Sequence, residues 1–147
     1  MCNWMPVVPS GFDVRGPLLK LTPREALALC LVQSDKLTTV KEVSVPEPPS
    51  LLALDGHFVC MASLNNYYIV HLETGSHQLI CSNDRSDSSI RPICKYIARD
   101  EFLINGFSHL GVFVKTSGIS ERPPVDWGND VLQIGFSYPY VLCLKSH

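Results

Sequence analysis

The stretch EFLINGFSHLGVFVKTSGISERPPVDWGNDVLQIGFSYPYVLCL, residues 101–144, decides the fold. It consists of short runs of β-branched and aromatic residues separated by Gly, Pro, Asn and Ser, the pattern of strands joined by turns. Strands are expected at residues 101–105, 111–115, 131–136 and 138–144. Because side chains alternate along a strand, Val112 and Val114 should lie on one face and Phe113 on the other.

The same pattern continues toward the N-terminus. Asp55-Gly56 between two apolar runs predicts a hairpin of strands 50–54 and 57–63. Strands 67–72 and 77–81 would complete an antiparallel meander of the size of one propeller blade. Residues 82–91 are polar and should form a solvated loop before a strand at 93–98.

Residues 1–28 are expected to form an irregular N-terminal segment, and residues 29–147 to form the domain. Two interpretations compete near the boundary. Thr22-Pro23-Arg24-Glu25 has the residue order of a helix start, which favours a short helical turn over 22–28. Leu29–Val43 is instead predicted as a hairpin that turns at Ser34-Asp35.

Several motifs carry a family resemblance: EFL-x-N-G from residue 101, LGVFV from 110, SGIS-x-RPPV-x-W from 117 and FSYPYV from 136. TVKEVS at 39–44, LDGHFVCM at 54–61 and PSG…RG at 9–16 agree with them. Together they resemble the citron homology (CNH) domain, in the form found in the family of transforming growth factor-β receptor-associated and CORVET tethering subunits. The resemblance covers residues 6–16 and 30–144 and departs at 17–29, where the family chain is longer.

The resemblance implies an all-β fold: a partial β-propeller of about three blades of antiparallel meanders, hence an incomplete citron homology domain. A full propeller of this family needs roughly twice the present length. Since each blade packs on its neighbours, an incomplete ring should leave two apolar blade faces uncovered. The chain alone is therefore expected to be poorly soluble or oligomeric.

By resemblance, the chain is a non-enzymatic protein-interaction module of an endosomal vesicle-tethering subunit, cytoplasmic and peripheral on early endosomes. The implied partners are other tethering-complex subunits, a Rab GTPase, and the transforming growth factor-β receptor with Smad. The alternative is a citron homology domain of a kinase or Rho exchange factor that binds small GTPases. A small β-sandwich hydrolase is a third hypothesis, based only on scattered His and Cys residues.

Composition agrees with one globular domain without a charged partner. The 147 residues are 46% hydrophobic and 18% charged, with a formal net charge of −2. This balance gives no electrostatic reason to expect nucleic acid or direct membrane binding, so membrane contact should pass through partners. The six Cys form no C-x-x-C pair, and the N-terminus MCNWMPVV does not resemble a signal peptide, so buried free thiols are expected.

No catalytic, cofactor or metal site is predicted, and binding residues cannot be assigned from the sequence. The five His (57, 71, 77, 109 and 147) are interpreted as strand-face or turn residues. The most distinctive segment is Arg122–Trp127, RPPVDW. Its favoured interpretation is a proline-fixed crossing whose Trp fills the space between blades, and the competing one is a binding surface rich in Trp and Arg.

Overall fold

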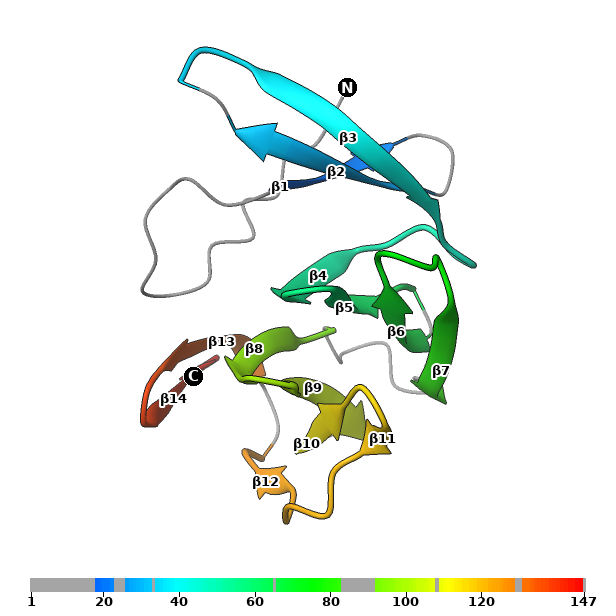
Figure 1. Cartoon of the computed structure of the whole chain (residues 1–147). Helices are drawn as coiled ribbons and strands as arrows, with labels where there is room; N and C mark the ends of the chain where they lie inside the picture. The colour runs from blue at the N-terminus through cyan, green and yellow to red at the C-terminus, as the bar shows by residue number, and fades with distance from the viewer. Residues whose placement is uncertain are drawn as a thin grey trace.

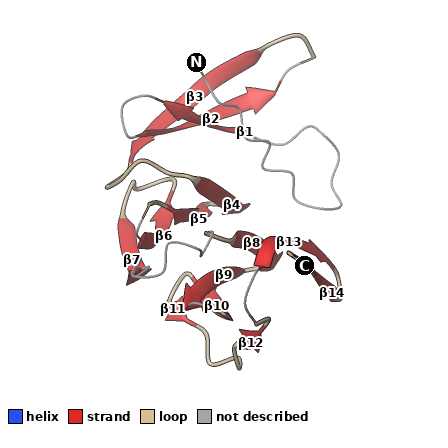
Figure 2. Cartoon of the chain, turned by 180° about the vertical axis from the view of Figure 1, so that it is seen from behind, coloured by secondary structure: helices blue, strands red, loops and turns tan. Residues whose placement is uncertain are grey.

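The computed structural model describes residues 18–22, 26–32, 34–64, 66–82, 92–107, 109–128 and 131–146. In these residues the regular structure consists of fourteen strands, arranged in four antiparallel sheets that follow one another along the chain (Figures 1 and 2). We call these sheets the first to the fourth blade. The expected all-β class is confirmed.

The first blade contains β1 (Leu18–Thr22), β2 (Ala26–Val32) and β3 (Leu37–Ser44), hydrogen-bonded in that order. The hairpin over 29–43 is confirmed, but the expectation of irregular chain is wrong for 18–22 and 26–28. The helical turn is also wrong, because Leu27 is fully buried against the second blade and this packing outweighs local helix propensity. Residues 1–17 and 23–25 lie outside the described residues, so the domain boundary at residue 29 stays a prediction.

The second blade is the meander expected from the Asp55-Gly56 turn. Its strands are β4 (Leu51–Asp55), β5 (Phe58–Ala62), β6 (Asn66–His71) and β7 (His77–Ser82), in sequence order across the sheet. Gly56 has φ of +55°, a backbone conformation that glycine adopts without steric cost. The turn residue chosen from the sequence is thus the one that the hairpin requires.

The third blade contains β8 (Cys94–Ala98), β9 (Glu101–Phe107), β10 (Leu110–Lys115) and β11 (Gly118–Ile119), with β12 (Val125–Asp126) also paired to β10. The fourth blade contains β13 (Val131–Ser137) and β14 (Tyr140–Lys145). The sequence placed the last strand two residues too early. Tyr138-Pro139, joined by a cis peptide bond, form the turn instead.

Three hydrophobic cores lie between the four blades, one at each interface, because both faces of the middle blades are apolar. The first core joins the first and second blades: Leu27, Val43, Val45, Leu54, Val59, Met61, Tyr68, Val70 and Leu72. The second joins the second and third blades: Ala53, Cys60, Ala62, Tyr67, Ile69, Cys94, Phe102, Ile104 and Val114. The third joins the third and fourth blades: Ile93, Leu103, Phe113, Trp127 and Ile134. The predicted alternation of Val114 and Phe113 is confirmed, since they lie in different cores.

The second, third and fourth blades fan out around their first strands, β4, β8 and β13 (Figure 1). In Figure 1, β8 lies between β4 and β13, and it contacts both of them. The outer strands β7 and β11 lie away from this centre (Figure 1). Successive meanders that radiate from their inner strands and share faces make a partial β-propeller, as the family resemblance implied, but with four sheets in the described residues where about three blades were expected.

Both ends of the stack expose apolar side chains, as expected for an incomplete ring. At the first end, β3 exposes Leu37 and Val40. At the other end, the fourth blade exposes Tyr140, Leu142 and Leu144 to 68%, 63% and 58%. Solubility and oligomeric state remain predictions.

Candidate interaction surfaces

The segment 119–127 crosses the edge of the third blade and is fixed there by Arg122. The Arg122 Nη2 atom lies 3.1 Å from Oε2 of Glu101, whose side chain is only 7% exposed. The same guanidinium stacks over the Phe113 ring, 4.7 Å from its centroid. Arg122 therefore neutralises a buried carboxylate and covers an aromatic ring.

Trp127, at the end of this segment, is buried between the third and fourth blades. Its backbone N–H donates to the His109 carbonyl at 3.1 Å, which holds the chain beside the start of β10. A Cβ atom on Gly111 would lie 2.1 Å from Cη2 of the indole, so glycine is required for this contact. The predicted role of Trp127 as a plug between blades is confirmed.

Removing the Arg122 side chain should leave Glu101 without its cation. We expect Arg122→Ala to lower the free energy of unfolding by about 1–3 kcal/mol, less than for a fully buried pair because Arg122 is half exposed. Urea denaturation would measure this loss. The control is Arg122→Ala combined with Glu101→Gln, which should restore part of the stability; a double variant as unstable as the sum of both singles would contradict the pairing.

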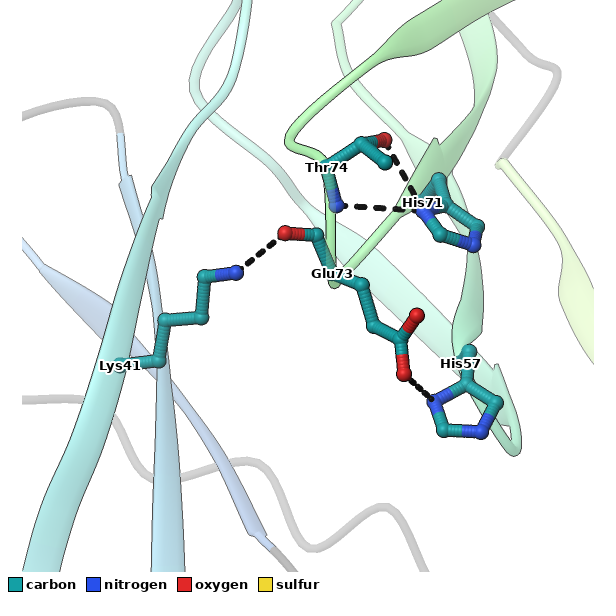
Figure 3. Close-up of polar contacts among 5 residues, drawn as sticks. All are labelled: Lys41, His57, His71, Glu73 and Thr74. Carbon is teal, nitrogen blue, oxygen red and sulfur yellow. Dashed lines mark hydrogen bonds and ion pairs between the residues drawn. The ribbon is translucent and has the colours of Figure 1, made fainter.

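Polar turns gather at one rim of the second blade, where it meets the first (Figure 3). The Lys41 ammonium group on β3 donates to the Glu73 carbonyl. The Glu73 carboxylate lies 3.1 Å from Nδ1 of His57, and both side chains are mostly exposed. We call Lys41, His57, Glu73 and Thr74, with the neighbouring turns β4–β5, β6–β7 and β8–β9, the polar rim.

His71 holds the turn between β6 and β7 in place. Its Nδ1 accepts a hydrogen bond from the Thr74 backbone N–H at 3.2 Å and lies 2.9 Å from the Thr74 hydroxyl (Figure 3). Its ring also contacts Phe58 edge-on, with centroids 4.7 Å apart. His71 is thus a turn-supporting residue, as its position in the sequence indicated.

A second set of hydrogen bonds ties turns of the second and third blades together. The Asp100 backbone N–H donates to the Asp55 carboxylate, and the Asp100 carboxylate accepts from the Thr116 N–H at 3.0 Å. Asp100 has φ of +59°, a conformation in which Asp is tolerated better than most residues. The turns on this rim are therefore linked across blades, so they form a rigid surface.

Glu47 performs the same task in the connector between the first two blades. Its carboxylate accepts hydrogen bonds from the hydroxyl of Ser63, the amide of Asn66 and, at 2.7 Å, the hydroxyl of Tyr68. The Ser63 hydroxyl is the main cause that lowers the pKa of Glu47, with the Tyr68 hydroxyl second. Donors that favour the ionised form keep this carboxylate charged at neutral pH.

The cysteines are free thiols where the structure describes them. Cys30, Cys60 and Cys94 are buried, as expected, but Cys143 on β14 is exposed. The second core brings Cys60 and Cys94 together, since the Cys94 thiol donates to the Cys60 carbonyl at 3.2 Å. Burial raises the pKa of Cys81 to about 11.

Alkaline pH should therefore destabilise the fold. The contact with Cys94 and burial raise the pKa of Cys60, and burial raises that of Tyr67. A raised pKa means that the folded protein keeps a proton that the unfolded chain releases, so stability is complete below about pH 9 and falls toward pH 11. Urea denaturation across this pH range measures the loss of stability. In the control Cys81→Ser the free energy of unfolding should fall less steeply with pH, and a stability that does not change with pH would contradict the expectation.

Two cavities lie near the fourth blade. One, of about 200 Å³, is lined by the inner strands of three blades: Leu51, Pro92, Ile93, Cys94, Lys95, Leu132, Gln133 and Ile134. The other, of about 300 Å³, lies on the open face of β13–β14: Gln133, Gly135, Leu142, Cys143 and Leu144. The first lies where the inner strands β4, β8 and β13 meet, and the second lies on the exposed face of the fourth blade.

Within the described ranges, no three His, Cys, Asp or Glu side chains are grouped so that they could hold a metal ion. His57 and His71 are turn and rim residues, and His77 begins β7. His147 lies outside the described residues. Nor does that part of the chain include a helix long and apolar enough to cross a bilayer.

Comparison with known proteins supports the same fold. The solved structure of the "AfRom2 CNH domain" superposes with a TM-score of 0.56 at 20% identity, covering 88% of this chain and 44% of that one. The "N-terminal Domain of Nup159" gives a TM-score of 0.52 at 11% identity over 85% of this chain and 34% of that one. At such identities these likenesses show the fold alone.

Sequence relatives are more specific. "Transforming growth factor-beta receptor-associated protein 1" is 41% identical in both Bos taurus and Homo sapiens, over 97% of this chain and 16% of theirs. The Danio rerio homolog is 37% identical over the same fractions. The chain thus spans about a sixth of the length of these relatives. The profile of the CNH domain matches residues 12–147, so the chain belongs to the CNH domain family.

Proposed function

We propose that the chain is a protein-interaction module of an endosomal vesicle-tethering subunit of the CORVET type, acting in vesicle transport and early endosome fusion. The observation that carries the proposal is the 37–41% identity, along 97% of the chain, to receptor-associated proteins that share its CNH domain. The proposed partners are sibling tethering subunits and a Rab GTPase, with the transforming growth factor-β receptor and Smad as signalling partners.

The polar rim supports a docking role. Its turns come from different blades and are linked by side-chain hydrogen bonds, so little conformational freedom would be lost on binding. Loops that a rigid scaffold positions are common binding elements. We therefore propose the rim around His57 and Glu73 as the partner-binding face.

A pull-down with the 147-residue chain tests the proposal. Purified tethering subunits and GTP-loaded Rab proteins should be retained, and Glu73→Lys combined with His57→Ala should reduce retention at least tenfold. Glu121→Lys, a charge reversal on an exposed residue of the crossing segment, is the matched control and should bind normally.

Two outcomes would contradict the proposal. Retention of Rho-family GTPases without tethering subunits would favour the alternative, a citron homology domain of a kinase or Rho exchange factor. If the rim variant and the control retained the same amount of partner, the polar rim would not be the binding face. The partners identified by the pull-down would still stand.

A further inference from the structure

Two adjacent prolines are exposed on the third blade. Pro123 and Pro124 lie in the chain that joins β11 to β12, and both side chains are exposed. In Figure 1 this chain makes a loop at the outer edge of the third blade, away from the inner strand β8. We call residues 121–126 the proline strap. It is separate from the polar rim, which is formed by turns of other strands.

The covalent chemistry of the strap restricts its backbone. Each proline ring fixes its own φ, and a residue that precedes a proline is restricted to extended or polyproline II backbone. Arg122 and Pro123 both precede a proline, so residues 122–124 form a short polyproline II ridge. Since proline has no N–H group, this pair cannot donate to a neighbouring strand, and pairing with β10 begins only at Val125.

The fold holds the strap on both sides of the prolines. On one side the Arg122 guanidinium pairs with Glu101 at 3.1 Å and stacks over the Phe113 ring at 4.7 Å. On the other side Val125 pairs with Gly111 of β10, and Trp127 is buried between two blades. The exposed ridge is therefore preorganised, so a partner that binds it would immobilise few additional bonds.

We propose that the proline strap docks a partner domain whose groove is lined by aromatic rings and reads polyproline II backbone, as the grooves of SH3 and WW domains do. The two proline rings would pack between the aromatic rings, and donors of the groove would bind carbonyl groups of the strap. Glu121 and Asp126 are exposed on either side of the prolines, whereas the charge of Arg122 is matched by Glu101. The complementary groove therefore has Lys or Arg residues beside its aromatic rings.

A second proline pair in the chain lacks these properties. Pro48 and Pro49 belong to the connector between the first two blades, and Pro49 is half-buried. The neighbouring Glu47 turns its carboxylate into the fold, where it accepts hydrogen bonds from Ser63 and Tyr68. The connector thus presents one exposed proline of the pair and no exposed flanking carboxylate at Glu47, which makes it a matched control.

Titration of the 147-residue chain against immobilised, purified SH3 and WW domains tests the inference. Domains with basic residues beside the groove should bind, and replacement of a groove tryptophan by alanine in the same domain should abolish binding. Pro123→Ala combined with Pro124→Ala should weaken binding about tenfold or more. Pro48→Ala combined with Pro49→Ala should bind as the unchanged chain does. Binding by no domain, or equal binding by both double variants, would overturn the inference.

A charge variant guards against misfolding of the alanine variant and separates the strap from the polar rim. Glu121→Lys changes one exposed side chain and should weaken binding of the same SH3 or WW domain about threefold at low salt, with a smaller effect at high salt. Glu73→Lys combined with His57→Ala, which alters only the polar rim, should leave this binding unchanged. Loss of binding in the rim variant, or none in Glu121→Lys, would contradict the inference.

Discussion

Replacing Trp127 by alanine is expected to lower the free energy of unfolding by about 3–5 kcal/mol, the cost of removing a large buried aromatic side chain. Trp127 is 6% exposed and lies in the core between the third and fourth blades. Its loss would leave a cavity beside Phe113 and Ile134 and weaken the joint between the two blades. Urea denaturation of the purified variant is the measurement.

The matched control is Tyr140→Ala, which removes an aromatic side chain that is 68% exposed on the neighbouring blade. This control should change stability by no more than about 0.5 kcal/mol. If Trp127→Ala were as stable as Tyr140→Ala and lost only partner binding, Trp127 would be a binding residue and its structural role would be wrong.

Gly111→Ala should lower the free energy of unfolding nearly as much as Trp127→Ala, although it adds a single methyl group. The new Cβ atom would lie 2.1 Å and 2.2 Å from two carbons of the Trp127 ring, closer than van der Waals contact allows. Either the indole or β10 must move, and overpacking of this severity costs about 3 kcal/mol or more. A drop in the thermal midpoint would report it.

Gly135→Ala is the control, because a Cβ atom there would meet Leu142 at an ordinary 3.8 Å. It should leave stability unchanged or slightly improved. The combination Gly111→Ala with Trp127→Ala should be less destabilising than the sum of the two single changes, since the alanine then has room. Additive losses would show that Gly111 is needed for a reason other than the indole.

Most strands could be predicted because their faces alternate and their turns have specific chemistry. Tyr68, Val70 and Leu72 face one core and Ile69 faces the next, as the alternation in the sequence indicated. Asp55-Gly56 located its hairpin because few residues other than glycine accept a positive φ. The choice of a propeller, in contrast, came from the family resemblance, since strand spacing alone also fits a sandwich or a barrel.

Errors occurred where distant packing decides between local alternatives. The run after Thr22 has a helix-start pattern, yet Leu27 is buried by the second blade, a contact that no local rule contains. The site features were missed for the same reason. The Arg122–Glu101 pair joins residues 21 positions apart, and the fit of Gly111 against Trp127 depends on how the crossing segment returns over β10.

The number of cores that each blade contacts has a kinetic consequence. The second and third blades have a core on each face, whereas the first and the fourth each contact a single core. Amide protons in β5 and β9 should therefore exchange with solvent only through global opening, and those of β14 through frequent local fraying. Proteolytic nicking would begin in the two outer blades, and the central meanders would survive as the resistant remnant.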